Sequence, residues 1–303
     1  MVSFLYLFSH TSVDSSMFKH FFIYIVAFFC IVSMGLSQER LHGEWRGLLI
    51  SSGQNAETAD VIYLSLPEGD SKGFSRVEVL NTKEFAYKEF TFEIKNKTLS
   101  IEEKYIRLSS HSPSAPKCKL KYSLKYNDST MFLEGDFTSS DCRNKMGKVV
   151  LYRTEHPISS EKEPTLTHYW KYHFARAYDK GYPSPEVLER ERKNFEFQPI
   201  YFDHDESIIK EEFHGYLNKL AWMLDALPDL RLKVIGHTDA VGTDQYNMGL
   251  SERRAKAIKD YFLSRGIVQE KLEIDFKGKR MPVDTNKTQE GKQRNRRVDF
   301  KFV

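Results

Sequence analysis

The apolar residues Leu232, Val234 and Ile235 are followed by the polar residues His237, Thr238 and Asp239. Two adjacent arginines, Arg253 and Arg254, lie within the next helix-forming segment. A carboxylate and a guanidinium held close together suit a zwitterionic ligand, because the carboxylate pairs with an ammonium and the guanidinium donates two hydrogen bonds to a carboxylate. The same two side chains also suit a plain ion pair with each other. Taken alone, the residues leave a ligand clamp and a structural salt bridge open.

Two elements must position these side chains. Residues 230–238 are expected to form a buried strand, and α/β sheets commonly bind ligands at the carboxyl ends of their strands. Gly242 suits a loop of unusual backbone angles, and the next helix is predicted to begin near Ser251, a suitable N-cap residue. Adjacent residues on a helix point about 100° apart, so Arg254 is expected to border the apolar stripe while Arg253 points to solvent.

The elements from Phe195 onward alternate between strand and helix patterns. The predicted segments are a strand at 195–203, a helix at 210–227, a strand at 230–238, a helix at 251–265, a strand at 272–278 and a last strand at 296–303. This β-α-β-α-β-β order predicts an α/β sandwich, with helices packed against a small mixed sheet.

The motifs of this region resemble a known family. They are, in chain order, Gly236-His237-Thr238-Asp239, Gly242, Asn247, Leu250-Ser251-Glu252-Arg253-Arg254-Ala255 and Asn295-Arg296-Arg297-Val298. Their order and spacing resemble the OmpA C-terminal-like domain, a peptidoglycan-binding domain also found in Pal and MotB, over about residues 195–303. The resemblance implies that Asp239 and Arg254 bind the free end of diaminopimelate in the peptidoglycan stem peptide. It also implies that the same pocket is lined by Asp203, Thr238, Asn247 and Arg297.

One loop departs from the family pattern. Many members have Gly-x-Gly-Glu ahead of a proline, whereas this chain has Phe276-Lys277-Gly278-Lys279 ahead of Pro282. Because the first glycine and the acidic residue are missing, the resemblance does not fix the conformation of the loop around Lys279, while the expectation for Asp239 and Arg254 is unaffected.

Residues 38–154 are predicted to form an all-β domain, either a small barrel or a sandwich. Short runs rich in β-branched and aromatic residues alternate with turn signals, and residues 119–126 place lysines on one face and apolar residues on the other. The runs are mostly shorter than the ~9–11 residues of a membrane-spanning strand and are interrupted by charge, which disfavours a transmembrane barrel.

The start of this domain bears a weak likeness to another family. Gly43-Glu44-Trp45-Arg46-Gly47 resembles the Gly-x-Trp start of lipocalin-like barrels. That likeness implies a carrier of a small apolar ligand or lipid, with an open cavity lined by Tyr63, Phe92 and Phe132. The other interpretation makes Trp45 a core residue that closes one end of a barrel.

Residues 155–194 are predicted to be a helical linker. Pro157 and Pro164 mark a break, and Ser184 followed by Pro185 predicts a helix start with proline at its first position. We expect two short helices that brace the domains, with the Tyr and Trp residues of 168–182 serving packing rather than binding.

Residues 1–37 are predicted to be a signal peptide. Export signals typically have a short basic segment, here from Met17, then an apolar run, here over 21–36, and small residues before the cleavage site, here before Gln38. We expect Met17 to be the true start and cleavage to follow Ser37. The alternative is a retained membrane anchor. Export leaves Cys118 and Cys142 as an even pair, for which a structural disulfide is expected, because no CxxC spacing or histidine cluster supports a redox or metal site.

The charge balance argues against a nucleic-acid partner. The net charge is only +3 with 29% charged residues, and a nucleic-acid-binding protein usually carries a strong basic stripe. The group His237, Asp239 and Ser251 gives no arrangement of nucleophile, base and orienting residue. We therefore expect no enzyme, cofactor or metal.

The sequence as a whole predicts a multidomain, non-catalytic protein that binds peptidoglycan and tethers the β domain to the cell wall. Its location is expected to be the periplasm, or the periplasmic face of the outer membrane, in a diderm bacterium. The β domain is expected to contact other outer-membrane or envelope proteins, with the small-ligand carrier kept as the alternative.

Overall fold

The computed structural model describes residues 41–158, 164 and 168–303. The predicted signal peptide, its start at Met17 and Cys30 lie outside these residues. The chain divides into two compact units, Met1–Asp179 and Lys180–Val303. Within the described residues, no helix has both the length and the apolar composition needed to cross a bilayer.

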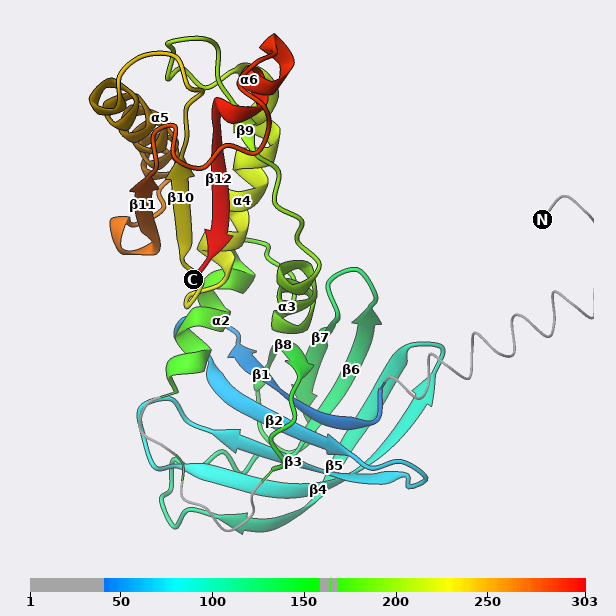
Figure 1. Ribbon diagram of the computed structural model, residues 1–303. Coiled ribbons are helices and arrows are strands. Elements are labelled where there is room, and N and C mark those ends of the chain that lie inside the picture. The colour runs from blue at the N-terminus through cyan, green and yellow to red at the C-terminus, as the bar shows by residue number, and fades with distance from the viewer. Residues whose placement is uncertain (1–40, 159–163, 165–167) are drawn as a thin grey trace, which may run out of the picture. The chain divides into compact units, whose positions relative to one another are not determined.

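Unit 1 contains a closed antiparallel barrel of eight strands, in which each strand pairs with the next and β8 pairs back with β1 (Figure 1). The strands are β1 (Gly43–Ser51), β2 (Asp60–Leu66), β3 (Lys72–Glu78), β4 (Phe85–Lys95), β5 (Thr98–Ser109), β6 (Leu120–Asn127), β7 (Phe132–Ser139) and β8 (Met146–Arg153). The predicted alternation is confirmed in β6, whose apolar residues are buried and whose lysines are exposed. Of the two predicted architectures, the described residues form the barrel.

The barrel interior is filled by buried side chains. Trp45, Phe90 and Phe137 are each at most 1% exposed and belong to one continuous core. The Trp45 indole donates to the Leu41 carbonyl at 2.9 Å, which satisfies its polar group inside the core. Trp45 therefore serves as a core residue, as the second interpretation of its motif predicted.

Helix α2 (Tyr169–Asp179) packs on the outer face of this barrel. Phe174 and Trp170 stack around Tyr152 of β8, with ring centroids 4.7 and 5.9 Å away, whereas Tyr169 is 76% exposed. Most of the aromatic stripe thus serves packing, as predicted. The second predicted helix of the linker belongs to the other compact unit, so each helix packs within its own unit.

Cys118 and Cys142 form a disulfide with a Cα–Cα distance of 5.7 Å. Cys118 precedes β6 and Cys142 follows β7, and the start of β6 pairs with the end of β7 through Leu120 and Ser139. The bond therefore fastens one end of the barrel.

Replacing both cysteines by alanine is expected to lower the free energy of unfolding of the barrel by about 3 kcal/mol, because the sequence separation of 24 residues sets the loop entropy that the bond removes from the unfolded chain. Urea unfolding of the variant and of the wild type, each with and without reductant, measures the difference. A wild-type midpoint that reductant leaves unchanged would contradict this stabilising role.

Unit 2 is an α/β sandwich on a four-stranded mixed sheet of order β11-β10-β12-β9. Its elements are α3 (Pro185–Lys193), β9 (Ile200–Tyr201), η1 (Glu211–Phe213), α4 (His214–Ala226), β10 (Leu232–Gly236), α5 (Asp244–Ser264), η2 (Gln269–Lys271), β11 (Leu272–Phe276), α6 (Gln289–Asn295) and β12 (Arg297–Phe302). Helices α4 and α5 bury their apolar residues against one face of the sheet (Figure 1). As predicted, α3 begins with Ser184 as its cap and proline at its start.

Three details of unit 2 differ from the prediction. Of the strand predicted at 195–203, only Ile200 and Tyr201 form β9. Helix α5 begins at Asp244, because the Thr243 hydroxyl accepts a hydrogen bond from the Tyr246 amide at 3.2 Å. Ser251 is therefore not a cap but a buried residue inside the helix. The short helix α6 was not predicted at all, since its sequence, QEGKQRN, carries no apolar periodicity.

Candidate functional site

The close approach of β10 to α5 creates the candidate site. Gly236 ends β10, and a Cβ atom at this position would lie 2.0 Å from the Ser251 carbonyl oxygen in α5. Glycine therefore allows the strand end to touch the helix backbone. Gly242 then has a φ of +93°, which turns the loop back toward α5, as expected.

A pocket of about 170 Å³ lies between this loop and α5. Four of the predicted site residues line it together: Thr238, Asp239, Asn247 and Arg254. All four residues are at most 4% exposed. The Asn247 amide donates to the Val241 carbonyl at 2.9 Å, so this residue also fixes the loop.

Arg254 is completely buried at the base of the pocket, while its neighbour Arg253 is exposed, as the helix geometry predicted. Its guanidinium donates three hydrogen bonds of 2.8–3.0 Å to the backbone carbonyls of Glu206, His237 and Asp203. Burial, together with the nearby positive charge of Arg296, lowers the pKa of Arg254 to about 10. The side chain thus remains a cation at neutral pH in a place where its charge is costly.

Asp239 pairs with Arg296 and not with Arg254, so the plain ion pair between Asp239 and Arg254 is not formed. Its Oδ2 atom accepts a hydrogen bond from Arg296 Nη1 at 2.9 Å, and its Oδ1 atom accepts one from the Val241 amide at 3.1 Å. The exposed His204 lies near by, with Nδ1 3.9 Å from Oδ2. The carboxylate keeps accepting capacity toward the pocket, because each oxygen offers about two lone-pair sites.

The prediction of Arg297 as a pocket residue is wrong, since Arg296 lines the pocket in its place. Arg297 is the first residue of β12 and forms an ion pair with Asp299 at 2.9 Å. Arg296 is the C-cap of α6. The predicted strand at 296–303 included both arginines, so their side chains were expected to point to opposite faces. The strand β12 in fact begins at Arg297, and Arg296 lies just before it.

Asp203 contributes to the site through its backbone. Its carbonyl accepts from Arg254, whereas its carboxylate pairs with Lys210 at 2.7 Å and is 54% exposed. It is not among the residues lining the pocket.

The sequence prediction missed the residues at the pocket rim. His204, Asp205, Val241 and Tyr246 line the opening, and the Tyr246 hydroxyl donates a hydrogen bond to the Asp205 carboxylate. His204 and Asp205 directly follow Asp203, a predicted site residue. This proximity is the one signal in the sequence that could have identified them.

The loop that departs from the family pattern is held by its own contacts. Lys279 Nζ lies 2.9 Å from the Asp244 carboxylate and donates to the Gly242 carbonyl at 3.2 Å. Gly278 has a φ of +55° and accepts a hydrogen bond from the Thr238 amide at 3.0 Å. The loop thereby supports the pocket through Gly242 and Thr238.

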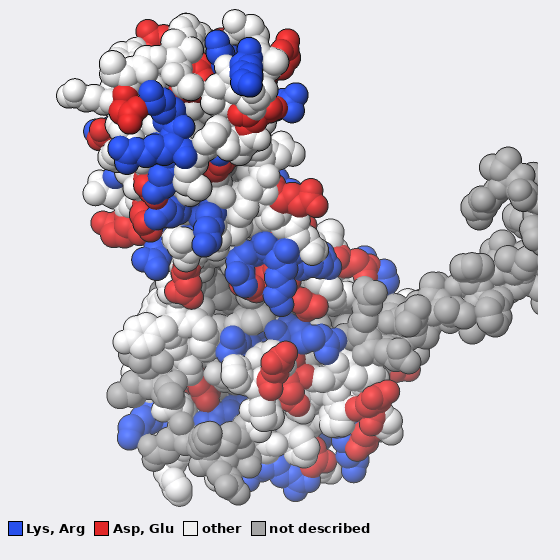
Figure 2. All heavy atoms as spheres, viewed as in Figure 1, with Lys and Arg blue, Asp and Glu red and all other residues white. Residues whose placement is uncertain are grey.

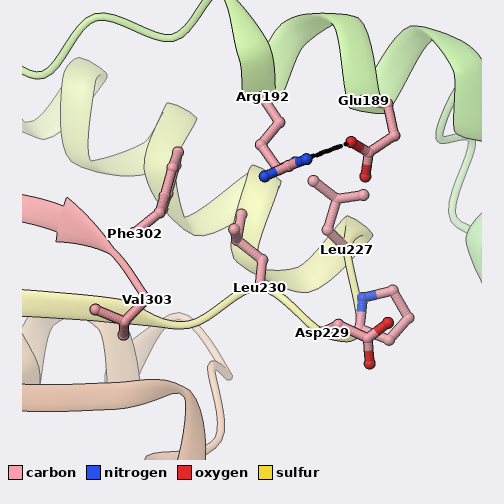
Figure 3. Close-up of a pocket in the computed structure, with 8 residues that line it drawn as sticks. Glu189, Arg192, Leu227, Asp229, Leu230, Phe302 and Val303 are labelled. Carbon is pink, nitrogen blue, oxygen red and sulfur yellow. Dashed lines mark hydrogen bonds and ion pairs between the residues drawn. The ribbon is translucent and has the colours of Figure 1, made fainter.

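Charges of both signs are mixed on one face of the described residues. Lysine and arginine side chains lie among acidic side chains over the face shown in Figure 2. A larger pocket of about 380 Å³ near the end of β12 is lined by apolar residues, by Asp229, and by Glu189 and Arg192 of α3 (Figure 3). These two charges pair with each other at 2.8 Å and are 46% and 40% exposed. None of the predicted site residues lines this pocket.

The described residues offer one group with the spacing of a metal site, formed by Cys118, Asp141 and Cys142. Its two sulfurs are joined in the disulfide, and a thiolate is the form of cysteine that binds metal. The residues present therefore do not fit a metal ion.

The expected apolar cavity of the barrel is not formed by the residues named for it. Phe92 belongs to the interior core, whereas Phe132 packs on the outer face against Phe174 of α2. Tyr63 is half-buried beside Trp170, also of α2. The three side chains do not share one cavity, because they lie on different faces of the barrel wall.

The comparisons with known proteins concern unit 2. A family model described as "OmpA family" matches residues 201–296. Outer membrane protein A of Bordetella avium is 42% identical over 103 residues, which are 34% of this chain and 53% of that protein. Peptidoglycan-binding protein ArfA of Mycobacterium tuberculosis (strain ATCC 25618 / H37Rv) is 36% identical over 102 residues, 34% of this chain and 31% of that protein. The chain therefore spans about half the length of the first relative and about a third of the second.

One solved structure is also similar to part of the chain. The peptidoglycan-associated lipoprotein from Burkholderia pseudomallei aligns with 35% of this chain and 90% of its own, at 27% identity and a TM-score of 0.35. The family match and the sequence relatives lead to one conclusion. Residues 201–296 of this chain form an OmpA family domain.

Proposed function

We propose that unit 2 binds peptidoglycan without catalysis, through the free end of diaminopimelate in the stem peptide. The observation that carries this proposal is the pocket in which a buried carboxylate, Asp239, and a buried guanidinium, Arg254, both retain hydrogen-bonding capacity. The relative named as a peptidoglycan-binding protein supports peptidoglycan as the ligand.

The chemistry of the ligand matches the two side chains. The free end of diaminopimelate carries an ammonium and a carboxylate on one carbon. The ammonium fits against Asp239, and the carboxylate accepts from Arg254. Hydrogen bonds to charged groups contribute about 1.5–3 kcal/mol each, so the pair supplies a large part of the affinity and most of the selectivity.

The residues beside the pocket favour binding over catalysis. The Ser251 hydroxyl donates to the Met248 carbonyl at 2.9 Å and accepts from the Gly278 amide at 3.0 Å. His237 Nε2 lies 3.3 Å from the Asp299 carboxylate. A serine nucleophile needs a histidine base within hydrogen-bond reach, and these contacts commit both groups elsewhere.

In this proposal unit 2 tethers the barrel of unit 1 to the cell wall. Several relatives are named as outer membrane proteins, which supports a place in the cell envelope. The barrel then faces the periplasm or the inner side of the outer membrane and contacts envelope proteins there.

Replacing Asp239 by asparagine is expected to reduce binding to diaminopimelate-type peptidoglycan by at least about tenfold, because asparagine keeps the shape but loses the charge that attracts the ammonium. Sedimentation of the full chain with purified wall material measures the bound fraction. The matched control is Asp260→Asn, which changes an exposed aspartate of α5.

Wall material with lysine in place of diaminopimelate provides the ligand control. The proposal requires that the wild type and Asp260→Asn sediment with the first wall type and remain in solution with the second. Equal sedimentation of Asp239→Asn and the wild type would show that Asp239 is only part of a structural ion pair.

A further inference from the structure

The buried charges of the pocket do not cancel. Arg254 and Arg296 are 0% and 9% exposed, and Asp239, the one buried carboxylate lining the pocket, is 4% exposed. Asp239 is paired with Arg296 at 2.9 Å. The three contacts of Arg254 are all to uncharged backbone carbonyls.

The other charged groups around the pocket do not restore the balance. Asp205, His204 and Arg253 are exposed, and water screens their charges strongly. The lowered pKa of Arg254, caused by burial and then by repulsion from Arg296, agrees with an excess of buried positive charge. An anion entering the pocket relieves this excess, whereas a neutral group does not.

The hydrogen bonds of Arg254 add a second requirement. A guanidinium carries five N–H groups and no acceptor. Three of these groups are used on backbone carbonyls, through Nε, Nη1 and Nη2. One N–H on each terminal nitrogen remains. A carboxylate accepts both, but a carboxamide offers one oxygen and turns its own N–H donors toward the guanidinium.

We propose that the pocket selects the free carboxylate of diaminopimelate over its carboxamide, and that Arg296 sets this selectivity by pairing with Asp239, which keeps that carboxylate from pairing with Arg254. Arg254 is thereby left without a protein carboxylate in direct contact, and the ligand carboxylate takes that place. This inference rests on the proposed function and names the form of stem peptide that the site accepts.

The test compares three synthetic stem tripeptides that differ only at the third residue. They carry diaminopimelate with a free distal carboxylate, the same residue with that group as a carboxamide, and lysine. Calorimetric titration of the full chain is expected to show the free acid binding at least about tenfold more tightly than the carboxamide or the lysine peptide. Equal affinity for the acid and the carboxamide overturns the inference and leaves the proposed function standing. Binding of none of the three overturns both.

The role of Arg296 is tested by the ratio of the two affinities. Arg296→Gln removes the partner of Asp239, which is then free to pair with Arg254. Because Arg254 then has a protein counter-ion, the preference for the free acid is expected to fall to less than about threefold. Arg296→Lys is expected to keep the preference. Arg297→Gln is the matched control, since that buried arginine pairs with Asp299 outside the pocket. An unchanged preference in folded Arg296→Gln overturns the assignment to Arg296.

Discussion

An Arg254→Ala variant is expected to lose sedimentation with diaminopimelate-type wall material altogether. The substitution removes the two free N–H donors of the pocket and its unbalanced positive charge. It also leaves the carbonyls of Asp203, Glu206 and His237 without their donor. An unsatisfied buried acceptor costs about 1–3 kcal/mol, so the domain is expected to lose stability as well as affinity.

Because Arg254→Ala affects both properties, a second substitution separates them. Arg254→Lys keeps a cation but cannot reach three carbonyls and a ligand at once, and we expect weak binding by a folded domain. The matched control is Arg253→Ala, which removes the adjacent exposed arginine and should leave sedimentation unchanged. Circular dichroism establishes that each variant is folded. Sedimentation of folded Arg254→Ala at the wild-type level would refute the clamp.

A Lys88→Met variant is expected to destabilise the barrel by about 3–5 kcal/mol, because it leaves a buried carboxylate without its cation. Lys88 and Glu103 are paired at 2.8 Å inside the barrel, with side chains 1% and 0% exposed. Glu103 also accepts hydrogen bonds from Ser75, Tyr122 and the Leu120 amide at 2.6–2.8 Å. This network connects strands β3, β4, β5 and β6, so its loss affects half of the barrel wall.

Urea unfolding gives the size of the effect, and amide hydrogen exchange in β4 and β5 assigns it to the barrel. Combining Lys88→Met with Glu103→Gln should recover part of the loss, because the unpaired charge is then gone. Lys95→Met is the control on the same strand, since its pair with Glu93 is 76% and 63% exposed and should contribute less than about 1 kcal/mol. A Lys88→Met effect as small as that of the control would contradict the role given to the network.

Local patterns were enough to predict several elements. The period of two in β6 and the serine and proline at the start of α3 are signals within a few residues. The closure of the barrel through β1 and β8 joins segments about 100 residues apart, and no local pattern encodes which strands meet. The choice between barrel and sandwich therefore needed the structure.

The candidate site was predictable in its residue types but not in its pairing. Asp239 and Arg254 were expected to lie in one pocket, and they do. Their partners depend on backbone carbonyls and on where β12 begins, between Arg296 and Arg297. A shift of one residue at a strand boundary exchanges the side chains that face a site, and such boundaries are the least certain part of a sequence-based assignment.

The contacts of Arg254 also have a mechanical consequence. Unit 1 precedes unit 2 in the chain, so a pull on the barrel reaches the sheet of unit 2 through β9, which is paired to β12 at only two positions, Tyr201 and Ile200. Arg254 holds the carbonyls of Asp203 and Glu206 just beyond that strand. In a wall-bound protein, the residue that binds the ligand would thus also resist the peeling of the segment through which tension enters the domain.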